Sequence, residues 1–334
     1  MKLRMILKRG SRKFSKEIFT DEDGLRFATP EIVGEYRARR LRTDVIGELG
    51  CGIGGQTIQF ARFSSEVIAA ERDAEKLECA KRNARIYGVR NIRFILGDVM
   101  SKEVRRFFRD CDIIFCDPSR PPEEEVRGLS NCEPGIEEVI EFYSPFTGNL
   151  AFEAPPQIPP SRISFECEKE YISLNHQLNR LNLYFGELKK RDVSAVILPG
   201  EHILYGEGEL SYGEIENYLH EPDPAVVKAE LLGVLSERFD LRLCFQDGKR
   251  ILMSGDNLRS PFLKNSYLLR GICRTLSEVR DILERERAKK AVIRFEVPPS
   301  EYWNIRSKLE EGLNGERTFH IFRREKFIVC ERLE

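Results

Sequence analysis

Acidic side chains follow short apolar segments in the first third of the chain. Glu71 ends one such segment and lies 21 residues after Gly50, which follows another. A carboxylate at this spacing after a glycine-rich turn can accept the hydrogens of both hydroxyls of a ribose. Asp98 ends the next segment, where it is placed to reach an adenine amine. The spacing therefore predicts a site for a ligand that contains adenosine.

The glycine-rich turn itself, residues 48–55, lies between an apolar segment and a helix-like one. Its glycines permit a sharp turn and a close approach of the backbone to a ligand. A nicotinamide enzyme can carry the same ribose acid, but the pattern Glu-x-Gly-x-Gly lacks the final Gly-x-x-Gly spacing, which favours a sulfonium cofactor. The remaining alternative is that the glycines serve packing and the acids serve as caps. The predicted cofactor contacts in this region are Glu48, Gly50, Cys51, Gly52, Gly54, Glu71, Arg72, Asp98 and Val99.

The segments that must position these residues alternate between strand-like and helix-like patterns. Apolar runs of strand length occur at 45–49, 67–71, 92–96 and 112–116. Amphipathic segments of helix length separate them at 56–62, 74–87 and 102–109, and Gly88 fits the C-cap of the second. This order indicates successive βαβ units, a parallel sheet and an α/β, Rossmann-like fold.

The middle of the chain is less regular. Residues 148–160 are rich in proline and predict a loop that wraps the sheet. Strands are predicted at 162–168 and at 192–198, the second as the hairpin partner that closes the sheet. One helix is predicted over 223–239. The run Glu-Pro-Asp-Pro at 221–224 is interpreted as its start, with acids beside the positive end of the helix dipole, although the run could also border the active-site cleft.

The last part of the chain predicts a small α+β module. The predicted elements are, in order, a helix at 276–290, a strand at 291–297, a helix at 300–313 and a hairpin of 318–322 with 326–331. We expect a basic N-terminal extension and cofactor-closing segment at 1–43, a Rossmann-like domain at 44–215 and an α+β domain at 216–334. A chain of 334 residues has room for two cores.

Charge and cysteine usage limit the classes of protein. The formal net charge is −1, yet basic residues gather in the first sixteen positions and again at 37–42. Such clusters either neutralise phosphates or form a solvated surface. The nine cysteines are scattered without a Cys-x-x-Cys pair, so we expect reduced thiols and no metal site. Because no segment has the length and apolarity of a membrane span, we expect a cytoplasmic protein.

Several motifs resemble those of the RNA cap guanine-N2 methyltransferases, the trimethylguanosine synthase family. They are Thr-Pro-Glu at 29–31, Glu-Leu-Gly-Cys-Gly-Ile-Gly-Gly and the helix after it at 48–61, Asn-Ala at 83–84 and Tyr-Gly-Val at 87–89. The similarity covers about residues 24–118. It implies S-adenosylmethionine as the cofactor. It also implies that Phe27 and Thr29 contact the cofactor, because they lie in the segment that closes over the methionine end in that family, although packing of a loop would explain them too.

A second resemblance covers nearly the whole chain. Asp-Pro-Ser-Arg at 117–120 and the run Tyr-Leu-His-Glu-Pro-Asp-Pro-Ala-Val-Val-Lys-Ala at 218–229 look like the class I methyltransferases that carry a C-terminal THUMP-like domain. This resemblance implies a ferredoxin-like terminal module and an RNA substrate, since THUMP modules deliver RNA to modifying enzymes.

The resemblance also suggests which residues act on the acceptor. Asp117 stands where amino methyltransferases place the first residue of an (Asn/Asp/Ser)-Pro-Pro-aromatic motif, which holds an exocyclic amine toward the methyl group. The chain keeps Pro118 but has Ser119 for the second proline and Arg120 for the aromatic residue; an arginine can stack on a base and contact phosphate. The predicted catalytic residues are therefore Asp117, Pro118 and Arg120. We also count Asp117 among the cofactor contacts. Alternatively, Pro118 and Arg120 only end a strand.

The resemblances together imply an S-adenosylmethionine-dependent methyltransferase acting on a base of tRNA or rRNA, with guanine N2 as one possible target. The departure at Ser119 and Arg120 leaves a ring nitrogen or another acceptor open. Two other functions remain as alternatives: methylation of a small molecule or protein, and RNA binding without catalysis.

Overall fold

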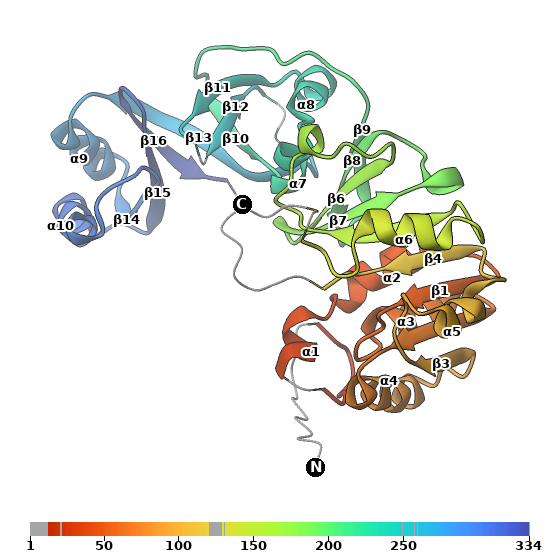
Figure 1. The fold of residues 1–334 in the computed structure, drawn as a ribbon. Coiled ribbons are helices and arrows are strands. Elements are labelled where there is room, and N and C mark those ends of the chain that lie inside the picture. The colour runs from red at the N-terminus through yellow and green to blue at the C-terminus, as the bar shows by residue number, and fades with distance from the viewer. Residues whose placement is uncertain are drawn as a thin grey trace. The chain divides into compact units, whose positions relative to one another are not determined.

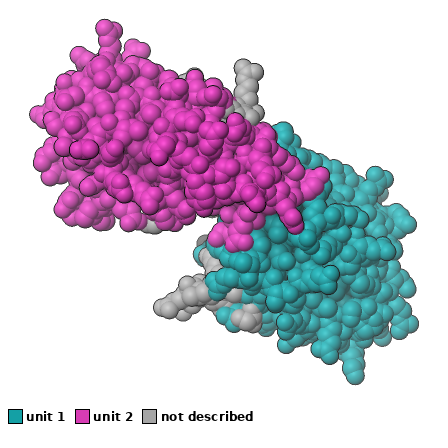
Figure 2. All heavy atoms as spheres, turned by 90° about the horizontal axis from the view of Figure 1, so that it is seen from above, with its two compact units in different colours: residues 1–203 teal, residues 204–334 magenta. Residues whose placement is uncertain are grey.

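The computed structural model describes residues 13–20, 22–119, 129, 131–248, 250–256, 258 and 260–333. The chain divides into two compact units, residues 1–203 and 204–334, teal and magenta in Figure 2. The domain boundary predicted from the sequence lies twelve residues later, between 215 and 216. It falls in a stretch without helix or strand and stays a prediction. No described helix is long and apolar enough to cross a membrane.

Unit 1 is built on a nine-stranded sheet with the order β3-β2-β1-β4-β5-β7-β6-β8-β9 (Figure 1). Strands β1 to β5 pair in parallel, whereas β7 runs antiparallel to both β5 and β6. The order reverses between β1 and β4, as in doubly wound sheets, which confirms the predicted Rossmann-like fold. The strands are β1 (Val45–Leu49), β2 (Glu66–Glu71), β3 (Ile92–Leu96), β4 (Ile113–Cys116), β5 (Leu150–Ala154), β6 (Glu168–Leu174), β7 (Gln177–Tyr184), β8 (Val193–Leu198) and β9 (His202–Tyr205).

Of the helices of unit 1, α4 is capped at both ends. The Asp73 side chain accepts from two N–H groups in the first turn of α4, and Gly88 ends α4 in the left-handed conformation, as the sequence predicted. The rings of Phe60 on α3 and Phe115 on β4 meet edge to face in the core under these helices. The helices are α1 (Glu22–Phe27), α2 (Glu31–Arg40), α3 (Gly55–Phe63), α4 (Ala74–Tyr87), α5 (Lys102–Arg105) and α6 (Ile136–Tyr143).

Three predictions in the middle of unit 1 were wrong. Residues 150–154, expected to form a loop, are the buried strand β5, because the prolines that suggested a loop begin only at Pro155. The strand predicted at 162–168 is absent, since β6 begins only at Glu168, and two buried carboxylates, Glu168 and Glu170, lie in its first three residues. In addition, β8 pairs in parallel with β6 and is therefore not a hairpin partner. The hairpin is β6–β7, turned by Asn175 and His176 at positive φ.

Unit 2 contains a seven-stranded sheet in the order β11-β12-β10-β13-β16-β15-β14. The helices α9 and α10 pack their apolar side chains on one face of β14, β15 and β16. The predicted terminal hairpin is confirmed as β15–β16. The strands are β10 (Tyr218–Pro222), β11 (Arg242–Gln246), β12 (Ile251–Ser254), β13 (Leu263–Cys273), β14 (Ala288–Ile293), β15 (Arg317–Arg323) and β16 (Phe327–Arg332). The helices are α7 (Pro224–Lys228), α8 (Leu232–Phe239), α9 (Leu276–Arg285) and α10 (Pro299–Glu310).

The single helix predicted over 223–239 is two helices. The chain breaks at Glu230, which has a φ of 60°, and α8 begins only at Leu232. The first turn of α8 then lies close to another segment, since a Cβ on Gly233 would lie 2.0 Å from the carbonyl oxygen of Gly208. The Asp223 carboxylate does cap α7, as interpreted from the sequence, whereas Glu221 belongs to β10 and caps nothing.

Candidate active site at the carboxyl edge of the sheet

The carboxyl ends of five neighbouring strands of unit 1 share one edge. In the register of the sheet, Leu49 pairs with both Ala70 and Cys116, and Cys116 pairs with Phe152. The residues at or just beyond these strand ends, in order from β3 to β5, are Asp98, Glu71, Gly50, Asp117 and Glu153. We call this set the carboxyl row. Open α/β sheets bind ligands beyond the carboxyl ends of their strands, where the strand order reverses, and here that point lies between β1 and β4.

The glycine turn between β1 and α3 leaves open space beside the row. Gly50 and Gly52 have φ values of 79° and 53°, and a Cβ added to either would meet no atom within 4 Å. Gly54 differs, because a Cβ there would lie 3.0 Å from the Cβ of Ala80 on α4. The first two glycines therefore keep a space free for a ligand, while the third lets two helices pack closely.

The N–H groups of this turn are already used inside the protein. Gly50 and Cys51 both donate to the carbonyl of Ala70, and Gly52 donates to Oε2 of Glu71 at 2.8 Å. A turn that cradles a pyrophosphate needs such N–H groups for the ligand. The geometry thus disfavours a dinucleotide and fits a cofactor without phosphate.

Glu71 keeps acceptor capacity for a ligand. Its two oxygens accept one backbone hydrogen bond each, from Gly52 and from Asp73, and a carboxylate offers about four acceptor positions. The side chain is fixed by these bonds and is largely buried. Asp98 is exposed and accepts from the N–H of Met100, while Val99 beside it is buried. Both acids can therefore receive ligand hydroxyl or amine hydrogens at fixed positions.

Glu48 is a buried carboxylate whose Oε2 has no hydrogen-bond partner among the described residues. Burial raises the pKa of Glu48 to about 8, and the nearby charge of Asp117 also raises it. Burial likewise raises the pKa of the Cys51 thiol well above its usual value. A carboxyl group in this state favours a ligand that brings a positive charge or a donor. Together with the open glycines and the free acceptor positions of Glu71, it fits S-adenosylmethionine, which carries an adenosine and an ammonium group.

A fully buried arginine lies next to Asp117 on the same face of the sheet. The guanidinium of Arg37 on α2 contacts the ring of Phe115, 4.7 Å from its centroid. It donates to Oε2 of Glu153 at 2.5 Å, and to Asn182 and Gln56. Arg37 therefore ties α2 and α3 to strands β5 and β7 beside the predicted catalytic acid.

Sequence reasoning missed this arrangement. The basic cluster at 37–42 suggested phosphate contacts or a solvated surface. In the structure, Arg37, Arg39 and Arg40 are each paired with a carboxylate of unit 1. Arg40, for example, binds Glu168 and Glu170 in β6. Glu153 was placed in a loop. No signal in the sequence pairs α2 with β5, because the partners are 116 residues apart in the chain.

Some predicted site residues lie in the row and others do not. Thr29 is buried and its hydroxyl donates to Glu153 at 3.4 Å, which places it by β5. Arg72 is exposed and forms an ion pair with Glu133. Pro118 is buried after β4, and Ser119 forms a β-bridge with Glu133. Arg120 and the side chain of Phe27 lie outside the described part of the structure.

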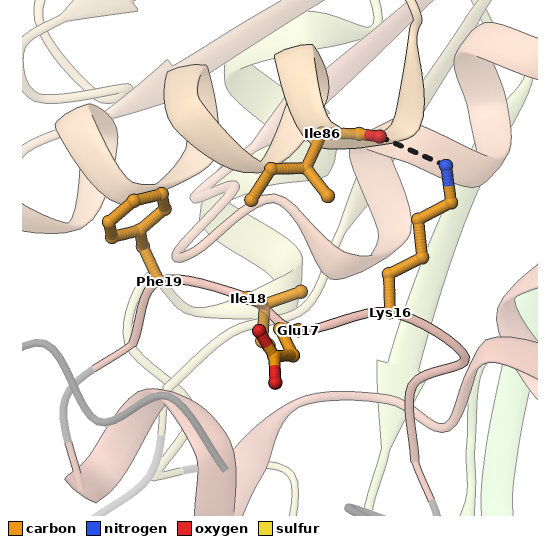
Figure 3. A pocket seen from close by; sticks show the side chains of 5 residues that line it. All are labelled: Lys16, Glu17, Ile18, Phe19 and Ile86. Carbon is orange, nitrogen blue, oxygen red and sulfur yellow. Dashed lines mark hydrogen bonds between the residues drawn. The ribbon is translucent and has the colours of Figure 1, made fainter. Parts of the chain in front are cut away.

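A separate cavity of about 520 Å³ lies between the N-terminal segment and the end of α4. Figure 3 shows its five lining residues, Lys16, Glu17, Ile18, Phe19 and Ile86, and the hydrogen bond from Lys16 to the carbonyl of Ile86. None of these residues belongs to the carboxyl row. The cavity is therefore distinct from the candidate active site.

Known proteins resemble this chain over its first unit and, at lower identity, over most of its length. Residues 43–122 match the family model of the RNA cap guanine-N2 methyltransferases. An uncharacterized S-adenosylmethionine-dependent methyltransferase of Mycobacterium tuberculosis is 24% identical over 277 residues, 80% of this chain and 74% of that protein. A 23S rRNA (uracil(1939)-C(5))-methyltransferase of Aeromonas salmonicida is 35% identical over 91 residues, 26% of this chain and 20% of that protein.

A solved structure extends the likeness to the whole fold. A protein of Porphyromonas gingivalis W83, described as a methyltransferase, superposes with a TM-score of 0.78 at 19% identity, over 95% of this chain and 84% of that one. Likeness at this identity concerns the fold alone. The family match, in contrast, spans the glycine turn, Glu71, Asp98 and Asp117, which are four parts of the carboxyl row. Because the matched residues are those that form the site, the chain is an S-adenosylmethionine-dependent methyltransferase.

Proposed function

We propose that this enzyme methylates a nucleotide base of RNA, in tRNA or rRNA, with guanine N2 as the first acceptor to test. The observation that carries the proposal is the position of Asp117, directly after β4 and beside the glycine turn. The family model that matches this region is named for guanine-N2 methylation of RNA caps, and the A. salmonicida relative for methylation of rRNA. The reaction belongs in the cytoplasm, where buried thiols such as Cys116 stay reduced.

Residues of the carboxyl row and of the glycine turn contact different parts of the cofactor. Glu71 accepts from the two ribose hydroxyls and Asp98 from the adenine amine. Glu48 supplies its unpartnered Oε2 to the ammonium group, whose charge favours the ionised carboxylate. The methyl group comes from the sulfonium of the cofactor. Cys51, Gly52, Gly54, Arg72 and Val99 complete the proposed contacts, with Phe27 and Thr29 from the segment before α2.

Asp117 orients the acceptor. Its side chain and carbonyl accept the hydrogens of an exocyclic amine, which aligns the nitrogen lone pair with the methyl carbon. Pro118 fixes the backbone after the strand, and Arg120 stacks on the base. When the nitrogen gains the methyl group it loses one proton, which Asp117 is placed to accept. The THUMP-like domain, residues 216–334, would hold the rest of the RNA.

The decisive measurement compares modified nucleosides from RNA of a strain that lacks the gene with RNA of its parent by mass spectrometry. We expect one methylated nucleoside to disappear, and to return when purified protein and S-adenosylmethionine are added to the RNA in vitro. If every methylated nucleoside persists and RNase-treated extracts still accept methyl groups, a small molecule or protein is the substrate and the proposal is wrong.

The role of Asp117 has its own test with a matched control. We expect Asp117→Ala to lower the rate of RNA methylation about 100-fold through loss of acceptor alignment, with little change in cofactor affinity. Asp110→Ala, an exposed acid at the opposite end of β4, should keep the normal rate. Equal rates for the two variants would remove Asp117 from the mechanism.

A further inference from the structure

The two faces of the β13–β16–β15–β14 part of unit 2 carry their cations differently. On the side covered by α9 and α10, three arginines are paired: the strand residues Arg270 and Arg317 both bind Glu331, and Arg280 of α9 binds Glu284. The alternation of strand residues places the neighbours of these side chains on the other face. Three cations on that second face, named below, have no such partner among the described residues of unit 2.

The register defines the second face. Lys290 pairs with Thr318 and Val292 with His320, so these side chains share one side of the sheet with Arg332 of β16. Arg294 follows β14 on the same side, where it contacts His320. Lys290, Thr318 and Arg332 are exposed, and Arg294 is half-buried. We call Lys290, Arg294, Thr318, His320 and Arg332 the open strip.

Three cations of the open strip have no carboxylate partner among the described residues. Lys290, Arg294 and Arg332 form no ion pair there, and Glu221, an acid on which the charge of Arg294 also acts, is paired with Lys264 at 3.2 Å. Glu221 also accepts from Asn265 and Tyr267. The charge of Glu221 is therefore balanced by Lys264, which leaves the open strip with three positive charges.

Arg294 is held in a defined position by a buried histidine. Its Nε donates to Nδ1 of His320 at 3.1 Å, and the His320 ring lies 5.2 Å from the ring of Tyr267. His320 is only 6% exposed, and burial lowers its pKa to about 4, so the ring is neutral and can accept this bond. One of the five N–H groups of the guanidinium is thereby used, and four remain, without an acceptor among the described residues, in the planar geometry that suits phosphate oxygens.

We propose that the open strip binds the phosphate backbone of RNA, with Arg294, Lys290 and Arg332 as the phosphate contacts. This inference rests on the proposed function, because it names the surface of unit 2 that receives the substrate. Unpaired cations spaced along one sheet face match a polyanion, whereas a single small anion would need only one of them. On the helix side, by contrast, Arg270, Arg280 and Arg317 already have carboxylate partners.

The test measures binding of total tRNA to the full-length protein by fluorescence anisotropy over a series of KCl concentrations. We expect the triple variant Lys290→Gln, Arg294→Gln, Arg332→Gln to bind more weakly and to lower the slope of log affinity against log salt by about 2 to 3, since each phosphate contact contributes about 0.7–0.9. The double variant of Lys290 and Arg332 alone, which keeps the Arg294–His320 bond, should lower it by about 1.5. Thermal melts monitored by circular dichroism confirm folding.

A matched control removes three cations from α9 and α10: Arg280→Gln, Arg285→Gln and Lys308→Gln. This variant should keep the slope of the unmodified protein. If the strip and control variants lose the same slope, or neither loses any while the unmodified protein binds tRNA, the open strip is not the RNA surface, although RNA can still be the substrate. If the unmodified protein does not bind tRNA at low salt, the RNA assignment itself fails.

Discussion

Arginines of α2 and arginines of the open strip look alike in the sequence but stand in opposite environments. Arg37 is fully buried against Glu153, and Arg40 binds two buried carboxylates of β6. Arg294 and Arg332 have no carboxylate partner among the described residues of unit 2. A cluster of positive charge therefore indicates a nucleic-acid surface only after its internal partners are known. The α2 cluster stabilises the fold of unit 1, while the open strip is free to bind.

The largest expected effect comes from breaking the buried pair. Arg37→Met should lower the free energy of unfolding by about 3–5 kcal/mol, because Glu153 loses one of its two arginine partners and the amide oxygens of Asn182 and Gln56 lose a buried donor. Arg294→Met in the open strip should cost less than about 1 kcal/mol, since it breaks one hydrogen bond at a half-buried site. Urea denaturation of both variants checks the difference.

A second variant separates charge from shape at the buried pair. In Arg37→Met, Glu153→Met, no uncompensated carboxylate is left, so we expect part of the lost stability to return. Arg180, which also pairs with Glu153, remains in all variants and loses this pair in the double variant, so the recovery should be partial. A double variant no more stable than Arg37→Met would mean that the carboxylate left behind is not what destabilises the single variant.

These buried ion pairs also show which parts of the structure could not be predicted from the sequence. Spacing and periodicity correctly placed β1 to β4, α4 with its glycine cap, and the acids that follow β2 and β3, because each depends on local pattern. The strands β5 and β6 escaped detection. β5 carries Glu153 and β6 carries Glu168 and Glu170, and each of these buried carboxylates binds an arginine of α2 more than 100 residues away, which no local pattern indicates.

The carboxyl row of unit 1 should bind the cofactor, whereas the open strip of unit 2 should bind RNA. Glu71→Gln should weaken S-adenosylmethionine binding about 10- to 100-fold, since charge-assisted hydrogen bonds contribute about 1.5–3 kcal/mol. RNA binding by the open strip should not change. Isothermal titration calorimetry measures the first and tRNA anisotropy the second. Glu75→Gln, an exposed acid in the first turn of α4, is the control and should bind the cofactor normally.

Long-range pairing likewise limited the prediction for unit 2. The helices α9 and α10 and the β15–β16 hairpin follow from local patterns, although both helices end earlier than expected. The sequence did not predict the break at Glu230 before α8, nor the close approach of Gly233 to Gly208, which is distant from it in the chain. The open strip depends on register, because only strand pairing places Arg294 against His320.

The smallest expected effect concerns the histidine that holds Arg294. His320 faces Arg294, Arg332, Glu221 and Tyr267, and burial lowers its pKa from about 6.5 to about 4. Between these two pH values the unfolded chain binds a proton that the folded protein does not. This group therefore lowers the stability of unit 2 as the pH falls from about 6.5 to about 4, with no further loss below that.

The measurement uses the fluorescence of Trp303, the one tryptophan of the chain, which lies on α10 in unit 2. We expect the urea midpoint of the unmodified protein to fall more between pH 7 and pH 4.5 than that of His320→Gln, which cannot titrate but can still accept from Arg294. His202→Gln, an exposed position in unit 1, should behave like the unmodified protein. If His320→Gln shows the full pH dependence, the histidine is not neutral in the folded protein, and its hold on Arg294 must be of another kind.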